Sequence, residues 1–343
     1  MSPPEYITGG GFSSDESSQL CFYKGLWHIE VSMLHADIED TDFSAEYLHL
    51  ISLKTWENPE TTRVVDDFVY AQCRHVLDQA PSTTSTVGVT LDRLCAAPRY
   101  DLRIVRDGIT RNIRVEGADN VSYMPTFDIA PLPIADLPKS CHSVPHIQAS
   151  TVTIAEDPTR APTTPQGEVL MADGTRKYFK HRWSYRQPDF AREVDCMARI
   201  EGAKIRGGET RIPALVGIVV DKDQAIGFLM DLIPTSPQGL HLLSEGFWER
   251  PELHRKWEKQ VTDMVEVLHE HGIVWGDVNP CNVVIDEELN AWIIDFGGMN
   301  NVEFIDDAKR ETVEGDWQGV KYLFRKWLPS RRVGGSAWGD GEA

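Results

Sequence analysis

The 343-residue sequence predicts an α+β fold with two lobes, preceded by a small mixed α/β N-terminal domain. Its length corresponds to about two domains at roughly 100–200 residues each. Prolines gather mid-chain; after them, β-rich segments surround one helical segment before the chain becomes mainly helical. We therefore expect an accessory domain of unknown role (1–120), a Pro-rich linker (121–147), a small β lobe (148–235), a reduced helical lobe (236–330) and a polar tail (331–343).

Three patterns predict the N-terminal domain. Residues 21–31 are rich in aromatic and β-branched side chains, which favours strands. Asp107-Gly108 separates two β-rich runs, which is a strong hairpin signal. Residues 64–79 carry apolar side chains at helical spacing, on a stripe of Val64, Phe68, Cys73 or Ala71, and Val76. We find no catalytic motif in this domain, so a role in binding a protein partner stays open.

The middle of the chain is predicted to be extended. Its prolines are Pro125, Pro131, Pro133, Pro138 and Pro145. Proline lacks a backbone donor and fixes φ, so this spacing is unfavourable for regular helices and central strands. Residues 121–147 are therefore expected to link the two parts of the protein.

The small lobe is predicted to contain five strands and one helix. The strands are expected at 151–154, 168–171, 177–180, 215–220 and 225–230, with turns at Ala172-Asp173-Gly174 and 221–223. The helix is expected at 191–200. In the helical lobe, Trp257, Val261, Met264, Val265 and Leu268 form one apolar stripe.

The composition excludes several function classes. The net charge of −19 is unfavourable for contact with phosphate backbones or anionic lipid, so we expect no nucleic-acid partner and no membrane surface. No apolar run reaches the 18 residues of a membrane span, and the start lacks the pattern of a secretory signal. The six cysteines form no CxxC pair, which is typical of free thiols. We expect an intracellular protein, cytoplasmic or nuclear and not secreted.

The chemistry is concentrated in residues 271–298. Asp277, Asn282 and Asp295 are oxygen-bearing side chains expected on loops or at strand ends beside a β-rich hairpin. Hard oxygen ligands of this kind suit Mg²⁺ and a polyphosphate better than a soft metal. Asp and Asn are also common in turns, where they cap loops, so a purely structural role is the alternative.

This segment resembles the catalytic loop and D-F-G turn of protein kinases. Trp275-Gly276-Asp277 stands at the H-R-D position, Asn282 follows Asp277 by five residues, and Asp295-Phe296-Gly297 begins 18 residues after Asp277. The Trp-Gly-Asp variant and the Gly-Gly after Phe296 look most like the fungal protein-kinase-like group, which has a short C-terminal lobe. The resemblance covers about residues 148–330.

The resemblance implies phosphoryl transfer from ATP with Mg²⁺ as cofactor. Asp277 would orient the acceptor hydroxyl and take its proton, while Asn282 and Asp295 would bind the metal. Lys180 would bind the phosphates. Glu193 would hold Lys180 in place, and Glu201 is the second candidate for that role. Met230 and Asp231 would lie at the segment that binds adenine.

Two departures from the family pattern bear on activity. The Gly-rich loop is missing, because Gly167 and Pro158, Pro162 and Pro165 occupy that connection. Asn279, which we include with Asp277 and Lys180 among the catalytic candidates, stands where protein kinases usually carry a lysine. The acceptor would be a protein Ser or Thr, or a small-molecule hydroxyl. The alternative is a pseudokinase, a binding or scaffolding module that has lost the chemistry.

The C-terminal end is short. Asp316 resembles the aspartate that begins the central large-lobe helix and braces the catalytic loop, although a plain N-cap is the alternative. Between Gly298 and Thr312 about a dozen residues remain for an activation segment, and no A-P-E follows.

Overall fold

The computed structural model describes residues 7–13, 17–24, 27–53, 59–77, 88–95, 99–108, 110–117, 121–122, 132–155, 166–182, 187–205, 210–298 and 301–331. The chain divides into two compact units, Met1–Asp128 with Ala149–Thr175, and Ile129–Gln148 with Arg176–Ala343. This division differs from the expected boundaries, because residues 149–175 group with the first unit and residues 129–148 with the second.

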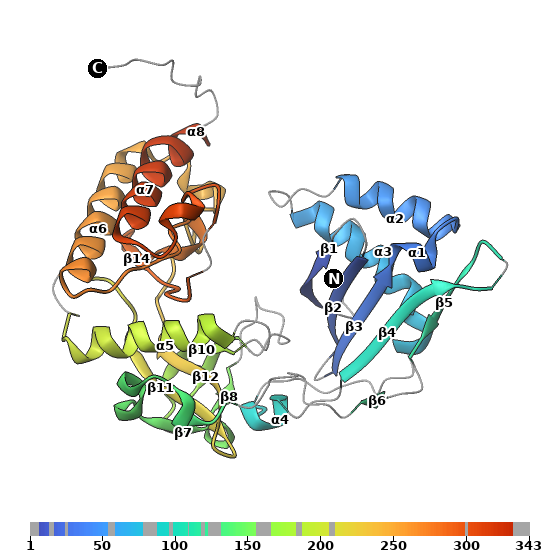
Figure 1. Ribbon diagram of the computed structural model, residues 1–343, viewed down its shortest axis with the longest axis horizontal. Coiled ribbons are helices and arrows are strands. Elements are labelled where there is room, and N and C mark those ends of the chain that lie inside the picture. Colours follow the sequence, from blue (N-terminus) through green and yellow to red (C-terminus); the bar gives the residue numbers. More distant parts are fainter. Residues whose placement is uncertain are drawn as a thin grey trace. The chain divides into compact units, whose positions relative to one another are not determined.

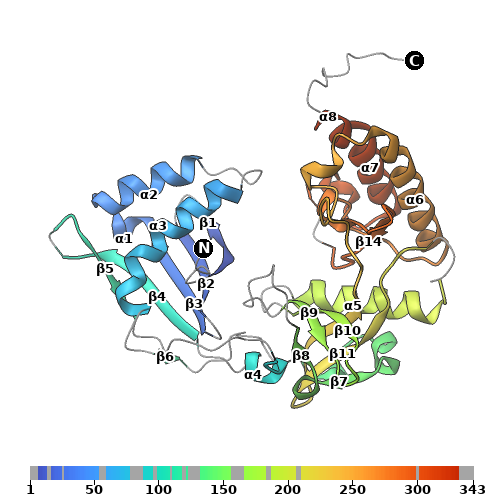
Figure 2. The ribbon, with the colours of Figure 1, turned by 180° about the vertical axis from the view of Figure 1, so that it is seen from behind.

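The first unit contains a sheet with the strand order β1-β2-β3-β4-β5, and β6 also pairs with β4. Its strands are β1 (Ile7–Ser13), β2 (Ser17–Lys24), β3 (Trp27–Leu34), β4 (Arg99–Arg106), β5 (Ile113–Glu116) and β6 (Val121–Ser122). Strands β3 and β4 run parallel, so their connection must cross over the sheet. That connection carries α1 (His35–Ile38), α2 (Asp42–Leu53), α3 (Pro59–Leu77) and α4 (Leu91–Cys95). Helices α2 and α3 lie over one face of the sheet (Figures 1 and 2).

The predicted helix at 64–79 is present as α3, but the predicted apolar stripe is shifted. Val64 is 51% exposed, whereas Val65 and Val69 are buried, together with Cys73 and Val76. The side chain four residues after Val65 lies on the same helix face, so Val65 and Val69 continue the stripe that faces the sheet. The assignment of Val64 to the core was therefore wrong.

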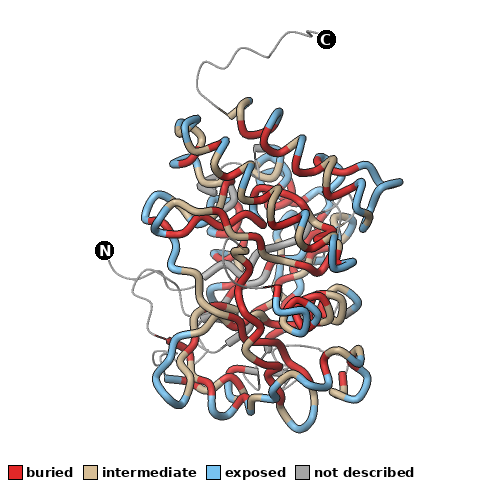
Figure 3. The backbone as a smooth tube through the Cα atoms, turned by 90° about the vertical axis from the view of Figure 1, so that its left-hand side faces the viewer, coloured by how far each residue is buried: buried red, intermediate tan, exposed pale blue. Residues whose placement is uncertain are grey.

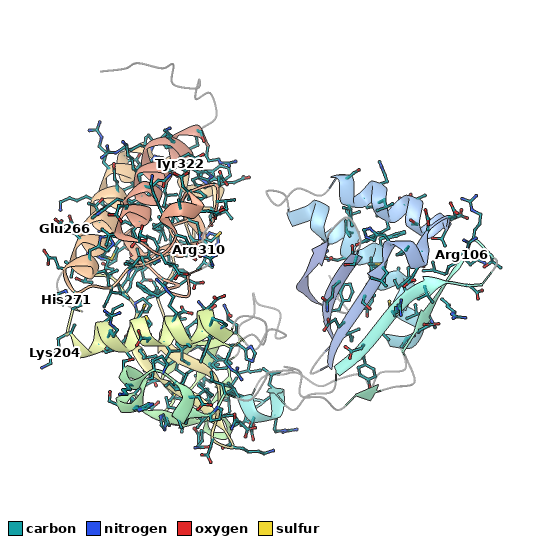
Figure 4. All side chains as sticks on the ribbon, viewed as in Figure 1. Arg106, Lys204, Glu266, His271, Arg310 and Tyr322 are labelled. Atoms are coloured by element: carbon teal, nitrogen blue, oxygen red, sulfur yellow. The ribbon has the colours of Figure 1, made fainter. Side chains whose placement is uncertain are left out.

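The predicted hairpin after residue 102 is confirmed by the antiparallel pair β4 and β5. The connection between the strands is wider than the Asp107-Gly108 pair alone. The backbone N–H of Asp107 donates to the carbonyl of Asn112 at 2.9 Å, so the connection closes at these two residues. Arg106, labelled in Figure 4, ends the first of the two strands.

A second sheet has the strand order β7-β11-β12-β10-β9-β8. Its strands are β7 (His146–Gln148), β8 (Thr153–Ile154), β9 (Gly167–Leu170), β10 (Arg176–His181), β11 (Leu215–Asp221) and β12 (Gln224–Asp231). The five predicted strands correspond to β8–β12, although β8 is shorter than expected and a 3-10 turn, Ala149–Thr151, precedes it. The predicted helix is α5 (Gln187–Gly202). Strand β7, which was not predicted, pairs in parallel with β11.

Residues 132–147, expected to lie in the linker, are part of the second unit together with Gln148. They form two 3-10 helices, Ile134–Asp136 and Lys139–Ser143, and then β7. Side chains of this segment enter the same buried cluster as α5 and β12, namely Leu132, Leu137 and Cys141. Prolines therefore prevent long regular elements here without preventing burial. The preceding residues 123–131 lie outside the described part of the chain.

The rest of the second unit is mainly helical. It contains α6 (Pro251–Glu270), the strand pair β13 (Val283–Ile285) and β14 (Ala291–Ile293), α7 (Val313–Tyr322), a π-helical turn (Leu323–Trp327) and α8 (Leu328–Ser330), with 3-10 turns at Glu245–Phe247, Pro280–Asn282 and Asp307–Lys309. The stripe predicted for α6 is confirmed, since all five of its members are buried. In Figure 3 buried stretches alternate with exposed turns along the helices. Within the described residues, no helix is both long and apolar enough to cross a membrane.

Candidate active site

Lys180 lies between two carboxylates. Its Nζ is 2.7 Å from Oε1 of Glu193 and 2.9 Å from Oδ1 of Asp295. Strand β10 provides the lysine, and α5 provides Glu193. The side chains of Lys180 and Glu193 are only 17% and 6% exposed. Burial lowers the pKa of Lys180, but the charges of Glu193 and Asp295 raise it more, so the net pKa lies above its usual range. The lysine is therefore held as a cation.

The second glutamate considered in the sequence has a different position. Oε1 of Glu201 accepts a hydrogen bond from the backbone N–H of Leu215 at 3.2 Å, at the start of β11. Glu201 lies in the last turn of α5, about two turns after Glu193. Glu193 is therefore the partner of Lys180.

Met230 and Asp231, predicted to lie at the segment that binds adenine, are the last two residues of strand β12. Met230 pairs with residues of both neighbouring strands, Tyr178 and Leu215, and is buried. The backbone N–H of Asp231 donates to the carbonyl of Ala214 at 3.0 Å. Strand β12 ends at Asp231, so the chain leaves the sheet only at residues 232–234.

Asp277 and Asn282 face each other across the catalytic loop. Nδ2 of Asn282 donates to Oδ2 of Asp277 at 2.8 Å and to its backbone carbonyl at 2.9 Å. Oδ1 of Asp277 is buried and has no hydrogen-bond partner among the described residues. Burial, and next to it the negative charge of Asp295, raises the pKa of Asp277 to about 7. A carboxylate with such a pKa is well suited to accept a proton near neutral pH.

Asn279 lies beside Asp277, but its side chain is engaged within the loop. Its Oδ1 accepts from the backbone N–H of Cys281 at 2.9 Å, and its Nδ2 donates to the backbone carbonyl of Asp277 at 3.3 Å. Asn279 is the N-cap of the 3-10 turn Pro280–Asn282. The position at which protein kinases carry a cation is thus used here to shape the loop.

The strand pair β13–β14 holds Asn282 and Asp295 at neighbouring ends. The backbone N–H of Ile294 donates to the carbonyl of Asn282 at 3.1 Å, which ties the two segments together next to the polar side chains. Asp295 has φ of +62°, in the left-handed region that non-glycine residues seldom adopt. Such conformations persist where the surrounding structure determines them, and they cluster at functional sites.

Asp316 connects α7 to the catalytic loop. Its carboxylate accepts hydrogen bonds from the backbone N–H groups of Trp275 and Gly276, each at 2.8 Å, and lies 2.8 Å from Nε2 of His269. Helix α7 is capped by Thr312, whose side chain accepts from the N–H of Gly315. Asp316 is therefore not the N-cap, which was the alternative, and its contacts are those of a residue that braces the loop.

Two contacts that fix the loop were not predicted from the sequence. The indole N–H of the fully buried Trp275 donates to the carbonyl of Ile294 at 2.9 Å, directly before Asp295. Arg192, the neighbour of Glu193, donates to backbone carbonyls of the catalytic loop. The glycine at position 276, where the family pattern has arginine, is the one signal in the sequence that a guanidinium from elsewhere fills this space.

Three oxygens at this site have no hydrogen-bond donor among the described residues: Oδ1 of Asp277, the amide oxygen of Asn282 and Oδ2 of Asp295. Mg²⁺ is usually bound by one or two carboxylates together with substrate phosphates, and this donor set fits such a use. Among the described residues no cluster of three or more His, Cys, Asp or Glu side chains could hold a metal alone. The connection that replaces the Gly-rich loop, residues 156–165, lies outside the described part of the chain.

Comparison with known proteins agrees with this geometry. Residues 176–333 match the family model of the RIO domain. The matched segment is similar to this domain. The RIO domain is a member of the protein-kinase-like superfamily, and the proteins that carry it are atypical kinases. The chain is also 32% identical over 89 residues, 26% of its length, to the serine/threonine-protein kinase Warts of Drosophila melanogaster, and this match spans only 8% of Warts.

Proposed function

We propose that the protein is an ATP- and Mg²⁺-dependent phosphotransferase that transfers the γ-phosphoryl group to a hydroxyl. The observation that supports this most is the convergence of Lys180, Asp277, Asn282 and Asp295 from separate elements on one site. The likeness to the RIO domain supports the same class. We propose a protein serine or threonine as acceptor, since the similar segment of Warts belongs to a serine/threonine-protein kinase. A small-molecule hydroxyl is the other acceptor class.

Each side chain has a role that its surroundings favour. Asp277 is positioned by Asn282 and has a free buried oxygen, so it can orient the hydroxyl and take its proton. Asn282 and Asp295 would hold Mg²⁺, which neutralises the charge of the phosphates when it is bound. Lys180 would bind the phosphates, and Glu193 keeps its ammonium in place. Met230 and Asp231 lead to the segment that would bind adenine.

The second candidate function is a pseudokinase that binds nucleotide without turnover. Asn279 supports it, because an amide engaged in the loop provides no charge where phosphoryl transfer develops negative charge. Asn279→Lys tests this point. If the missing cation limits turnover, this variant raises it at unchanged ATP affinity. Within the protein-kinase-like superfamily, we propose that the chain is most similar to the fungal group with a short C-terminal lobe.

A thermal-shift titration with ATP, with and without Mg²⁺, tests nucleotide binding, since a ligand of the folded state raises Tm by mass action. We expect a shift that requires Mg²⁺ and that Asp295→Ala removes, because this variant loses a carboxylate ligand. Asp306→Ala, which changes an exposed carboxylate of the same unit, is the control and keeps the shift. If ATP causes no shift in the parent protein, the proposed function is wrong. A shift in Tm without phosphoryl transfer to a protein hydroxyl, a small-molecule hydroxyl or water indicates the pseudokinase.

A further inference from the structure

We propose that Arg192 is a positioning residue that holds the catalytic loop and the Asp295 turn against α5. This inference rests on the proposed function where it concerns turnover, but the contacts on which it depends are independent of that function. Arg192 precedes Glu193 in α5, so the helix that holds Lys180 also provides this second link.

The guanidinium of Arg192 donates to three backbone carbonyls. Nη1 donates to the carbonyl of Trp275 at 3.2 Å and to that of Phe296, and Nη2 donates to the carbonyl of Val274 at 3.0 Å. Two of these carbonyls lie just before Asp277, and the third belongs to the residue after Asp295. One side chain therefore connects the loop that would carry the proton acceptor with the turn that would carry the metal ligand.

Gly276 makes the space in which the guanidinium lies. A Cβ at this position would be 2.6 Å from Nη2 of Arg192, closer than real Cβ contacts, and 3.1 Å from its Cζ, which is tighter than most of them, so the guanidinium would have to shift. The backbone φ of Gly276 is +86°, a conformation that glycine adopts without steric cost. The absence of a side chain at Gly276 and the presence of arginine at position 192 are thus complementary.

Glu311 adds a carboxylate near Nε of Arg192. Its Oε2 is 3.9 Å from Nε of Arg192, and its Oε1 is 3.7 Å from Nε of Arg310, which is labelled in Figure 4. Gly298 leaves room for this carboxylate, because a Cβ there would lie 2.7 Å from Oε1 of Glu311. Glu311 belongs to the short segment after the Asp295 turn, so this segment also contacts α5 through Arg192.

Arginine suits this position because its planar guanidinium has five donors in fixed directions and can bind several carbonyls at once. A lysine could not reach all three carbonyls from one ammonium. If α5 moved away, the Lys180–Glu193 pair and the Arg192 link would be lost together. The orientation of Asp277 and Asp295 therefore depends on α5, and a displacement of about 1 Å at a reacting group can cost about 10²-fold in rate.

Arg199 provides a matched control on the same helix. Its Nη2 donates to the carbonyl of Gly272 at 2.9 Å and lies 3.5 Å from that of His271, so it too links α5 to backbone carbonyls of the second unit. These carbonyls follow α6, whose end is marked by His271 in Figure 4, and precede the catalytic loop. Arg199→Gln therefore removes a similar helix-to-backbone link without touching residues 274–276 or 296.

The test compares Arg192→Gln, Arg192→Lys and Arg199→Gln in the full chain. Amide hydrogen exchange of residues 274–278 and 294–298 should be faster by about 10-fold in Arg192→Gln, intermediate in Arg192→Lys and unchanged in Arg199→Gln. In phosphoryl transfer, Arg192→Gln should lower kcat by about 10- to 100-fold with the KM for ATP within about threefold, because it changes the orientation of reacting groups more than binding.

Equal exchange in the two glutamine variants would overturn the proposal, as would a lower kcat in Arg199→Gln of the same size as in Arg192→Gln. If the parent protein transfers no phosphoryl group, the proposed function fails, while the exchange measurement still decides the role of Arg192. If Arg192→Gln does not fold, Arg192→Lys and Glu311→Gln replace it. Both should accelerate exchange in the same two segments, and unchanged exchange in both would overturn the proposal.

Discussion

Two aspartates, Asp316 and Asp277, differ in how fully their carboxylates are hydrogen-bonded. Asp316 is fully buried, and its two oxygens contact the backbone N–H groups of Trp275 and Gly276 and the ring of His269. Asp277 has one oxygen bonded to Asn282 and one buried oxygen without a partner among the described residues. Buried acceptors usually receive a hydrogen bond, so this oxygen of Asp277 can accept one from a bound ligand. Asp316 therefore stabilises the loop, whereas the loop leaves one oxygen of Asp277 available to a ligand.

The largest effect is expected for Asp277→Asn. The amide keeps the shape of the side chain but cannot accept a proton, so kcat and kcat/KM should fall together by about 10²- to 10⁴-fold. The variant should bind MgATP with unchanged affinity. Since it also removes a buried negative charge next to Asp295, Tm of the free protein should stay equal or rise. Steady-state kinetics and a thermal melt measure both parts. A fall in Tm at unchanged kcat would show that Asp277 is structural.

Asp316→Ala should have the opposite profile. It leaves two buried N–H groups and His269 without their acceptor, which should lower the free energy of unfolding by about 3–5 kcal/mol. Tm should then fall by on the order of 10 °C. Asp306→Ala is the matched control, because Asp306 is 64% exposed and should change stability by less than about 0.5 kcal/mol. Similar melts for the two variants would contradict the bracing role.

Lys180→Met should lie between these two profiles. The pair with Glu193 is buried, so its loss should cost about 1–3 kcal/mol; the cost is limited because Glu193, whose pKa burial raises to about 7, can take up a proton. MgATP affinity should also fall. Lys177→Met is the control on the same strand, since the Lys177–Asp231 pair, at 25% and 44% exposure, should contribute less than about 1 kcal/mol. Equal destabilisation by Lys180→Met and Lys177→Met would contradict the prediction that the buried pair contributes more to stability than the exposed one.

The smallest effect is expected for Gly319→Ala in α7. A Cβ there would be 2.6 Å from Cβ of Val278, next to Asp277, so either α7 or the catalytic loop must shift. Overpacking of this kind should outweigh the gain in helix propensity and cost about 1–2 kcal/mol. Gly202→Ala, at the end of α5 where nothing lies within 4 Å, should instead be neutral or stabilising. Urea unfolding of both variants measures the difference.

The residues of the candidate site could be predicted because the motif is local. Asp277, Asn282 and Asp295 lie on the short segments that flank the β13–β14 hairpin, and the resemblance to protein kinases selected Lys180 and Glu193. The contacts of Arg192 were not predicted, since they join residues 82 to 104 positions apart and end on backbone atoms, so Gly276 is their one mark in the sequence.

The errors in the fold have physical causes of the same kind. The stripe of α3 was placed on Val64 instead of Val65 because apolar residues occur on both sides of the true face, and only the sheet decides which side is buried. The segment 132–147 was read as a linker because its prolines exclude long elements. Short 3-10 turns and one strand are still compatible with proline, and they bury Leu137 and Cys141.

The chain passes back and forth between its two compact units, so neither unit can be cut out as one continuous fragment. Residues 129–148 belong to the second unit, residues 149–175 return to the first, and the chain then re-enters the second at Arg176. Neither unit is a continuous stretch of sequence. A fragment beginning at Arg176, where the likeness to the RIO domain begins, would lack β7 and the buried Leu132. It would expose the edge of β11 as a site for pairing with another chain, so the segment that resembles a complete domain would be prone to aggregation on its own.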